Sequence, residues 1–470
     1  MLMTKSYDLH HKKKSNYLWR MKFLLSLTLM LGLLSMVAEG QVVDVRTLSV
    51  AWNSSHISHI PPSLVRHSDL KIYLDRLRRN GMRIKEVGRS YGDREIYQVE
   101  WGVGTRRIFL WSQMHGDEPT ATSAMLDLMN YLDRNADKAW VKKLEKELTI
   151  RFVPMLNPDG AEFFQRRNLQ GIDINRDATY LKTPEGRLLK SLRDEWKPEI
   201  GFNLHNQGQL TTAGASGRQA SISFLAVLGD PSGITNPGFE RNKRVIASMV
   251  AALNAFIPGN LAKYDESFNG LAFGDNFSAW GTPVILIETG GLDGKDEMFL
   301  VKMNFIAIAT ALSTIANGYE NRFDAKLYET LPLNDSGLLY DVIFRNAAIV
   351  RSPGTEEIFK GDIGIIRERR RANFSSPTYI KSIGDLGEAS GLTEFDVSDF
   401  HVIHRFGNLD AGSSGELLFY RKTRSIDWKM DDLENSVTPD AVYSLGDWFI
   451  GSRIMSRTVI NTDSRRRAPH

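Results

Sequence analysis

The sequence contains no cysteine among its 470 residues. Disulfide bonds are therefore excluded, and so is a lipid attached through a thioether. Any zinc site must use histidine and carboxylate ligands, because thiolate ligands are absent. The fold must be stabilised by its core, and an apolar content of 42% makes that core large enough for more than one domain.

A strong net charge is also missing. The whole chain has a formal charge of +3, but residues 1–40 carry six basic residues against Asp8 and Glu39, which leaves the remainder at −1. Dense basic runs occur at residues 369–371 and 465–467, and such runs are typical of solvated loops and tails. The composition therefore gives no indication of nucleic-acid binding.

The N-terminal apolar run is too short for a membrane-spanning helix. Basic residues between Lys12 and Lys22 precede the apolar residues 23–37, and the small residues Ala38 and Gly40 follow two positions apart. The run has about 15 residues, whereas a spanning helix needs about 20. We expect residues 1–40 to be a signal peptide cleaved near Gly40, which predicts a secreted or periplasmic protein with no membrane attachment after cleavage.

Apolar strands and longer helices alternate over residues 41–325. This alternation predicts an α/β domain whose largely parallel sheet has helices on both faces. Residues 326–470 instead contain short runs of β-branched and aromatic residues separated by turn formers, which predict a smaller β-rich accessory domain. In the first domain we expect strands at 108–111, 148–155, 200–204 and 284–287, and helices at 63–80, 120–134, 187–196, 241–256 and 298–316.

Polar clusters follow directly after four of the expected strands. Ligands in open α/β sheets bind outside the carboxyl ends of the strands, so these clusters should lie close together. The co-location is more informative than any single motif. The clusters are His115-Gly116-Asp117-Glu118-Pro119, Asn157-Pro158-Asp159-Gly160, His205-Asn206-Gln207 and Glu288-Thr289-Gly290-Gly291.

Three residues of these clusters have the chemistry of a catalytic zinc site. Such a site uses three protein ligands, typically imidazoles and carboxylates, and keeps a fourth position open. His115 and Glu118 are three residues apart at the start of an expected helix, a spacing that is common by chance. His205, at the end of another strand, supplies the third ligand. We therefore predict one Zn²⁺ ion held by His115, Glu118 and His205.

Glu288 is the predicted general acid/base. It ends the most apolar strand of the chain, Val284-Ile285-Leu286-Ile287, where burial would raise its pKa towards the working range of such a group. A capping or salt-bridged glutamate at a strand end is the structural alternative.

Two further clusters lie between the second and third strand ends. Both would place charged side chains, arginines and aspartates, close to the expected metal. They are Arg166-Arg167-Asn168 and Asp173-Ile174-Asn175-Arg176-Asp177. Arginines near zinc can bind a substrate carboxylate and polarise a carbonyl, although isolated arginines are more often surface salt-bridge partners. Asp173 is a candidate acceptor for the outer N–H of a ligating imidazole.

The motifs taken together resemble those of the zinc metallocarboxypeptidase (carboxypeptidase A-like) family. The match runs in order over residues 115–290, within a region of similarity that covers most of residues 63–318. The resemblance implies an eight-stranded mixed sheet with helices on both faces, a single zinc ion and hydrolysis of C-terminal peptide bonds by a metal-activated water. The matching motifs are H-G-D-E-P, N-P-D-G, R-R-N, G-I-D-I-N-R-D, N-L-H-N and I-E-T-G.

The same resemblance implies a role for each site residue. His115, Glu118 and His205 would be the zinc ligands, and Glu288 would take the proton of the water and pass it to the leaving amine. Arg166 would stabilise the carbonyl oxygen, Asn175 and Arg176 would bind the terminal carboxylate of a peptide substrate, and Asp173 would support the first ligand histidine.

The sequence departs from the family at two places. The family usually has a mobile tyrosine about twenty residues before the catalytic glutamate, whereas Tyr264 lies 24 positions before Glu288 and the nearer candidates are not tyrosines. The segment Phe277-Ser278-Ala279-Trp280, which we expect to line the side-chain pocket, has neither an acidic residue nor a long apolar slot. The sequence therefore indicates no substrate preference, and it indicates no oligomeric state.

Two other functions stay open at the level of the sequence. A zinc amidase or acylase acting on cell-wall peptides or N-acyl amino acids would use the same metal ligands with a different pocket. A catalytically silent module that binds peptides or glycans would need no general base, so the presence of Glu288 disfavours it.

Overall fold

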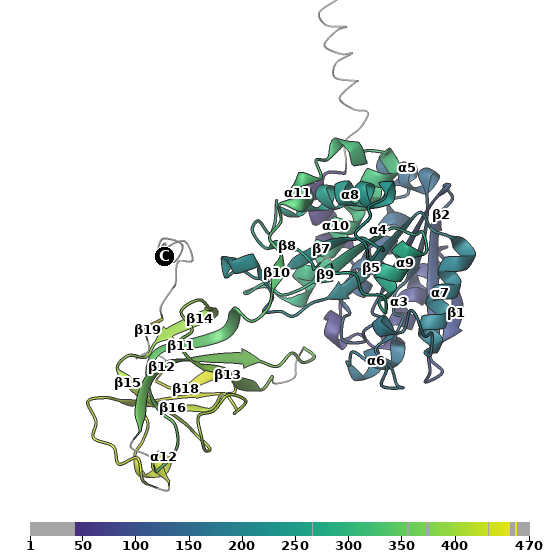
Figure 1. Ribbon diagram of the computed structural model, residues 1–470. Helices are drawn as coiled ribbons and strands as arrows, with labels where there is room; N and C mark the ends of the chain where they lie inside the picture. Colours follow the sequence, from purple (N-terminus) through teal and green to yellow (C-terminus); the bar gives the residue numbers. More distant parts are fainter. Residues whose placement is uncertain are drawn as a thin grey trace, which may run out of the picture.

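The computed structural model describes residues 43–265, 267–354, 357–372, 376–430, 432–451 and 456–457. The expected signal peptide, residues 1–40, lies outside these described residues. The described chain forms two units, each with its own sheet and hydrophobic core. Figure 1 shows the two units side by side, with the β-rich unit in green and yellow.

The first unit contains an eight-stranded mixed sheet in the order β1-β2-β4-β3-β5-β9-β7-β8. Its central strands β4, β3, β5 and β9 are parallel, while β1, β2 and β7 pair antiparallel with a neighbour. This confirms the predicted sheet. The strands are β1 (Arg83–Arg89), β2 (Glu95–Gly102), β3 (Arg106–Ser112), β4 (Leu148–Val153), β5 (Ile200–Asn206), β7 (Ile222–Val227), β8 (Leu261–Lys263) and β9 (Val284–Thr289).

Helices cover both faces of this sheet because the central strands are apolar on both sides. Along β3, Ile108 and Leu110 pack into one buried core while Phe109 and Trp111 pack into the other. The first face is covered by α2 (Val45–Ser55), α3 (His67–Arg79), α4 (Thr120–Arg134), α5 (Ala139–Glu147), α8 (Pro237–Leu253) and α10 (Glu297–Asn317), and the second by α7 (Pro184–Trp196) and α9 (Phe273–Ala279).

Helix α10 is long and apolar enough to cross a membrane by length and composition alone. Within this structure 83% of its apolar window is buried, mainly by α8 and α4. Asp296 caps its first turn and Gly318, with a φ of 64°, ends it. It is the central helix of the core on its face of the sheet.

The second unit is a nine-stranded sheet whose main path runs β13-β12-β11-β15-β16-β17-β18. Phe344 on β11 is fully buried and packs against Phe419 and Tyr443 from other strands. The strands are β11 (Leu339–Val350), β12 (Ile358–Arg367), β13 (Thr378–Gly384), β14 (Ser390–Asp396), β15 (Phe400–His404), β16 (Leu417–Arg421), β17 (Ala441–Ser444), β18 (Asp447–Ile450) and β19 (Ser456–Arg457).

The chain leaves the first unit later than the change in sequence pattern at residue 326. Helix α11 (Lys326–Glu329) packs on α8, and the buried hydroxyl of Tyr328 accepts a hydrogen bond from the N–H of Ala226 at 3.2 Å. Strand β10 (Asn334–Asp335) then pairs with β6 (Thr212–Ala213). These elements are too short to produce a periodic sequence pattern.

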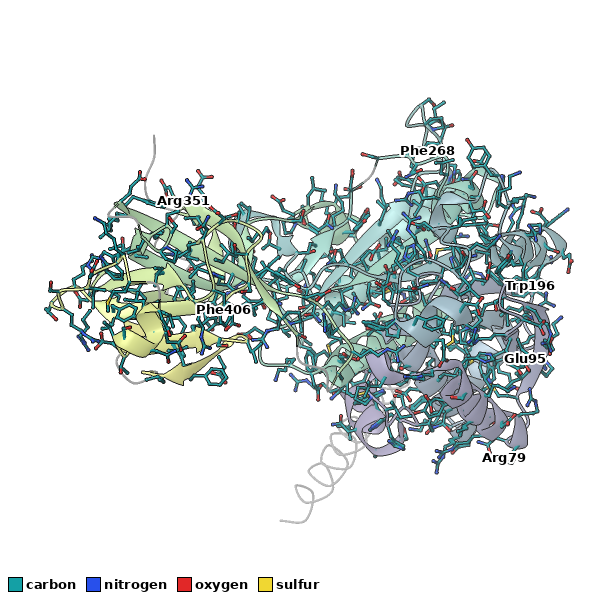
Figure 2. The ribbon with its side chains drawn as sticks, turned by 90° about the horizontal axis from the view of Figure 1, so that it is seen from below. Arg79, Glu95, Trp196, Phe268, Arg351 and Phe406 are labelled. Atoms are coloured by element: carbon teal, nitrogen blue, oxygen red, sulfur yellow. The ribbon has the colours of Figure 1, made fainter. Side chains whose placement is uncertain are left out.

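A second contact joins the units at the β12–β13 connection. A guanidinium nitrogen of Arg371 donates to the carbonyl oxygen of Ala161 at 3.0 Å, and the N–H of Ala372 donates to the hydroxyl of Ser63 at 2.9 Å. In Figure 2, Phe268 lies on a loop of the first unit, whereas Arg351 and Phe406 lie on the second unit.

Candidate metal centre

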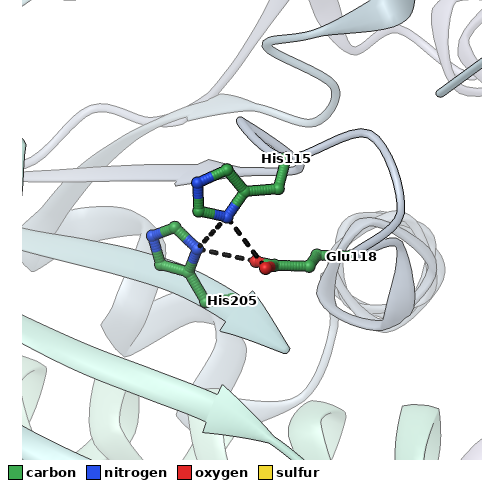
Figure 3. Close-up of side chains that lie close together, drawn as sticks. All are labelled: His115, Glu118 and His205. Atoms are coloured by element: carbon green, nitrogen blue, oxygen red, sulfur yellow. Dashed lines mark hydrogen bonds and ion pairs between the residues drawn. The ribbon is translucent and has the colours of Figure 1, made fainter. Parts of the chain in front are cut away.

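Three side chains from two separate parts of the sheet edge converge in the first unit (Figure 3). The Nδ1 atoms of His115 and His205 are 3.1 Å apart, and each lies 2.7–2.8 Å from a carboxylate oxygen of Glu118. All three side chains are buried, with exposed fractions of 2%, 2% and 6%. These are the residues that the sequence singles out, and they are a group of side chains that could hold a metal ion.

The backbone around His115 is held in an unusual path. Gln113 has a φ of 52°, and its side-chain amide donates to the carbonyl oxygen of Gly116 at 3.0 Å. A Cβ atom on Gly116 would lie 1.9 Å from the carbonyl carbon of Gly160, so glycine is required for this close approach. The amide of Asn157 donates to the carbonyl oxygens of Met114 and Arg166 at 3.2 and 3.3 Å. The N-P-D-G segment therefore braces the His115 loop.

Asp173 and Arg166 contact the outer side of the ligand set. The Nε2 atom of His115 lies 3.1 Å from Asp173 Oδ1, a geometry that fixes Nε2–H as donor and leaves Nδ1 free to bind a metal. Arg166 donates through Nε to Asp173 at 2.9 Å and through Nη1 to Glu118 at 3.2 Å. Asn206 completes the support of Glu118 with its backbone N–H at 3.1 Å.

The electrostatics of the three donors fit a cation. Burial would lower the pKa of the His115 imidazole, but Glu118 and Asp173 outweigh burial and raise this pKa to about 9. Burial would raise the pKa of Glu118, but the charges of His115 and His205 hold that pKa well below its ordinary value. The cluster thus favours positive charge among its donor atoms. Two nitrogens on one tetrahedral zinc ion would lie roughly 3.3 Å apart, close to the separation found here.

Glu288 lies next to the three candidate metal ligands but makes no hydrogen bond or ion pair with them. It occupies β9 directly opposite His205 on β5, and its side chain lines the same cavity. In the described part of the chain no group donates a hydrogen bond to its carboxylate, and the residue as a whole is 7% exposed. Burial first, and the charge of Glu118 second, raise the pKa of Glu288 well above its ordinary value.

Two adjoining cavities meet at Glu288. The first, of about 480 Å³, contains the three ligands and Arg166, and the second, of about 390 Å³, extends under the loop after β8. Asn175 and Arg176 line both cavities. The side-chain oxygen of Asn175 accepts from the N–H of Phe273 at 2.9 Å, so this residue also fixes the start of α9. All the predicted site residues therefore lie together.

Tyr264 is a site residue that the sequence spacing did not assign. It follows β8 and lines both cavities. Burial, followed by the charge of Glu288, raises the pKa of its phenol to about 12, so the hydroxyl keeps its proton at neutral pH. The signal that could have found it is its place just after a short strand, Leu261–Lys263, which is parallel to β7.

The expected side-chain pocket lies elsewhere. Phe277 is fully buried and its ring lies tilted against Trp111, with ring centroids 4.5 Å apart, and Trp280 packs against the same core. The prediction that residues 277–280 line the pocket is therefore wrong for these two aromatic rings. The second cavity is lined by Leu225, Val227, Leu286 and Asn203 from the strands, by Asp265 of the loop after β8 and by Asp275 of α9.

Known proteins of similar sequence are carboxypeptidases by name. Residues 72–222 match the model of the zinc carboxypeptidase family. Carboxypeptidase 2 of Trichophyton tonsurans is 32% identical over 120 residues, which are 26% of this chain and 21% of that protein. Carboxypeptidase D of Mus musculus is 28% identical over 173 residues, which are 32% of this chain and 13% of that protein.

The metallo-carboxypeptidase from Burkholderia cenocepacia superposes with a TM-score of 0.45 at 15% identity, over 54% of this chain and 69% of that one. The chain spans about a fifth of the length of the fungal relative. Glu288 and Tyr264 lie beyond the segment matched by the family model, so their placement depends on the structure.

Proposed function

We propose that this chain is a zinc-dependent metallocarboxypeptidase that hydrolyses C-terminal peptide bonds. The match of residues 72–222 to the model of the zinc carboxypeptidase family supports the proposal. One observation carries the proposal. Two imidazoles and one carboxylate converge within 3.1 Å of one another, and the unpaired carboxylate of Glu288 faces the same cavity. A binding module would need the cavity but not a buried base.

The residues divide the chemistry between them. His115, Glu118 and His205 would hold one zinc ion, which would supply Lewis acidity to the scissile carbonyl and to water. Glu288 takes a proton from the attacking water and delivers it to the leaving amine nitrogen, which its raised pKa favours. Asp173 keeps the His115 ring in the ligating tautomer.

The arginines bind the substrate at two points. Arg166, which already contacts Glu118, is placed to donate to the carbonyl oxygen as negative charge develops there. Asn175 and Arg176, where the two cavities meet, bind the free terminal carboxylate, and a guanidinium can do so with two parallel hydrogen bonds. Tyr264 adds an uncharged hydroxyl donor.

The test combines metal content with product analysis. The purified protein should contain about one zinc ion per chain and should release single C-terminal residues from a peptide library. Glu288→Gln should retain the zinc and lose activity by roughly 10²- to 10⁴-fold, the contribution expected of a general acid/base. A matched control is Glu329→Gln, which removes an exposed carboxylate on α11.

Three results would contradict the proposal in different ways. Activity that persists in Glu288→Gln removes the assigned base. Release of an acyl group or of cell-wall amides without release of C-terminal residues favours the amidase or acylase, which shares the ligand set. Zinc binding without any turnover favours a silent binding module.

We also propose that the protein is exported, with residues 1–40 as the signal peptide. The support is the basic-then-apolar composition of this segment. Expression of the full chain followed by N-terminal sequencing of the exported product should give a start near Gln41. A cell-retained product with an intact N-terminus would exclude this localisation.

A further inference from the structure

The segment that connects the two units forms part of the catalytic cavity. Asn334, Asp335 and Ser336 line the same cavity as the three metal ligands. On this side of the cavity they are joined by Gln207, Gly208 and Thr211, which follow β5. All six lie outside the set of residues to which the proposed chemistry gives a role.

The connecting segment is fixed against the first unit by several hydrogen bonds. Asn334 donates through its amide to the side-chain oxygen of Gln207 at 3.1 Å. The carbonyl oxygens of Pro332 and Leu333 accept from the N–H groups of Lys263 and Gly214, each at 2.8 Å. Lys263 is the residue before Tyr264, so the segment is bonded on both sides of the cavity. Residues 332–336 therefore form a fixed wall of the cavity.

The direction of a bound peptide follows from the two cavities. The second cavity contains Asn175 and Arg176 but none of the metal ligands, so it takes the C-terminal residue in the proposed function. The scissile carbonyl must lie at His115, Glu118 and His205. The residues upstream of that bond are then left in the remaining part of the first cavity, against residues 334–336.

The chemistry of this wall is polar and negatively charged. Among the described residues that line the first cavity, the cations are Arg166 and Arg176, both at the reaction end. Asp335, on the connecting segment, is exposed to solvent, and Asp265, which lines both cavities, is exposed as well. Asp335 uses one oxygen to accept from the N–H of Ser336 at 2.6 Å, and nothing in the described chain bonds to the other. A cationic group is complementary to this surface.

We propose that the connecting segment, through Asp335, forms a binding subsite for a positively charged group on the peptide substrate, upstream of the scissile bond. The group is an ammonium or guanidinium, supplied either by the side chain of the residue before the scissile bond or by the free amino terminus of a short peptide. This inference rests on the proposed carboxypeptidase function and names its preferred substrates.

The experiment compares matched peptides on the full zinc-loaded chain. N-acetylated tripeptides share one C-terminal residue, chosen from the library as the best released, and carry lysine or norleucine before it. An exposed ion pair contributes modestly, so kcat/KM should favour lysine by roughly two- to fivefold at low salt. The preference should shrink as salt is added, because solvent-exposed charges are screened. Unacetylated norleucine peptides test the amino terminus as the source of the charge.

The variant Asp335→Asn should reduce the lysine-to-norleucine ratio of kcat/KM to about one, while Asp399→Asn should leave it unchanged. Asp399 is an exposed aspartate of the second unit and therefore a matched loss of charge. A structural effect on folding would lower both rates and leave the ratio intact. Equal rates for the two peptides in the parent protein, or an unchanged ratio in Asp335→Asn, would overturn the subsite. Loss of all C-terminal release would instead contradict the proposed function.

Discussion

At the scale of single residues, Glu288 differs from the other carboxylates around the metal centre. Glu118 and Asp173 are each held by at least two donors, and the pKa of each carboxyl is lowered. Glu288 has no donor in the described chain, and its pKa is raised. Glu118 and Glu288 share one cavity, and their pKa values are shifted in opposite directions. This pattern is expected of a metal ligand beside a general base.

This difference predicts the acidic side of the pH profile. A general base must be deprotonated, so kcat/KM should fall as the pH drops below the pKa of Glu288. Because burial raises that pKa, the fall should begin above the ordinary value of about 4.3 for a glutamate. The measurement is kcat/KM from pH 4 to pH 8 on one peptide. Activity that stays constant down to about pH 4.3 would contradict the assignment.

The phenol of Tyr264 gives a second prediction. Its pKa of about 12 keeps it a hydrogen-bond donor at neutral pH, and it lines both cavities. Removing one donor to a charged substrate group costs about 1.5–3 kcal/mol, so Tyr264→Phe should lower kcat/KM roughly 10- to 100-fold. Tyr180→Phe, at an exposed position, is the matched control. If both variants retain full activity, Tyr264 has no role in binding or catalysis.

The three candidate metal ligands could be predicted from the sequence, whereas a role for Tyr264 could not, for a physical reason. A metal needs particular donor atoms, and His115, Glu118 and His205 come directly after or at the ends of recognisable strands. A tyrosine that contacts a substrate can be supplied from any loop of suitable length. Its position depends on how that loop folds, and the loop after β8 has no periodic pattern.

At the scale of elements, several motif residues near the centre are structural. Asp159 accepts from the N–H of Gly92 at 2.7 Å and so holds the β1–β2 turn. Asp177 accepts from Thr183 through both its N–H and its hydroxyl at 2.7 Å, at the start of α7. These aspartates explain why the polar clusters contain more acidic residues than the chemistry requires.

The loops that contain Gly116 and Gly160 approach so closely that adding one methyl group at Gly116 should destabilise the fold. Ala at position 116 would place a Cβ atom against the backbone of Gly160, and neither loop can yield without moving the His115 or Arg166 segment. Gly116→Ala should therefore destabilise the first unit by about 2 kcal/mol or more and weaken zinc binding. Chemical denaturation and zinc titration measure the two effects.

The control for this variant is Gly387→Ala in the second unit, where the added Cβ would meet only the side chain of Asp385. It should change the free energy of unfolding by less than about 1 kcal/mol, because ordinary surface substitutions change it by about 0.5 kcal/mol. Equal stability of Gly116→Ala and the parent protein would mean that the two loops separate more easily than their contact indicates.

Long regular elements were predicted well, and short ones were not. The helix expected at residues 120–134 is α4, and the strand expected at 284–287 is the start of β9, because burial on a regular period leaves a clear pattern. The expected helix at residues 63–80 is interrupted at Val65 and Arg66, between a 3₁₀ turn and α3. Strand β10, with two residues, has no period at all, and its pairing depends on distant residues.

At the scale of the whole molecule, the structure links the second unit to the reaction site through residues 332–336. The sequence indicated a β-rich accessory unit but no contact between it and the cavity. Such a contact depends on the path of the chain after α11, which is set by hydrogen bonds to Lys263, Gly214 and Gln207. None of these partners can be identified from sequence periodicity.

The metal centre also has a consequence for the stability of the whole first unit. Its donors come from the loop after β3 and from β5, so an ion bound there joins the two only when the sheet is folded. Zinc at 100 times its dissociation constant should stabilise the folded state by about 2.7 kcal/mol. Chelation should therefore lower the melting temperature and abolish peptide hydrolysis, and added zinc should restore both. An unchanged melting temperature after zinc removal, verified by metal analysis, would contradict the assigned site.

The pH dependence of zinc binding follows from the same donors. The pKa of His115 is about 9 in the protein without an ion, so the imidazole is protonated at neutral pH and zinc must displace that proton. The proton becomes harder to displace as the pH falls, so the apparent affinity should weaken by roughly tenfold per pH unit between pH 8 and pH 6. Competition titration with a coloured chelator at several pH values measures this slope. A slope of zero would mean that His115 is already neutral before zinc binds, and would contradict the raised pKa of its imidazole.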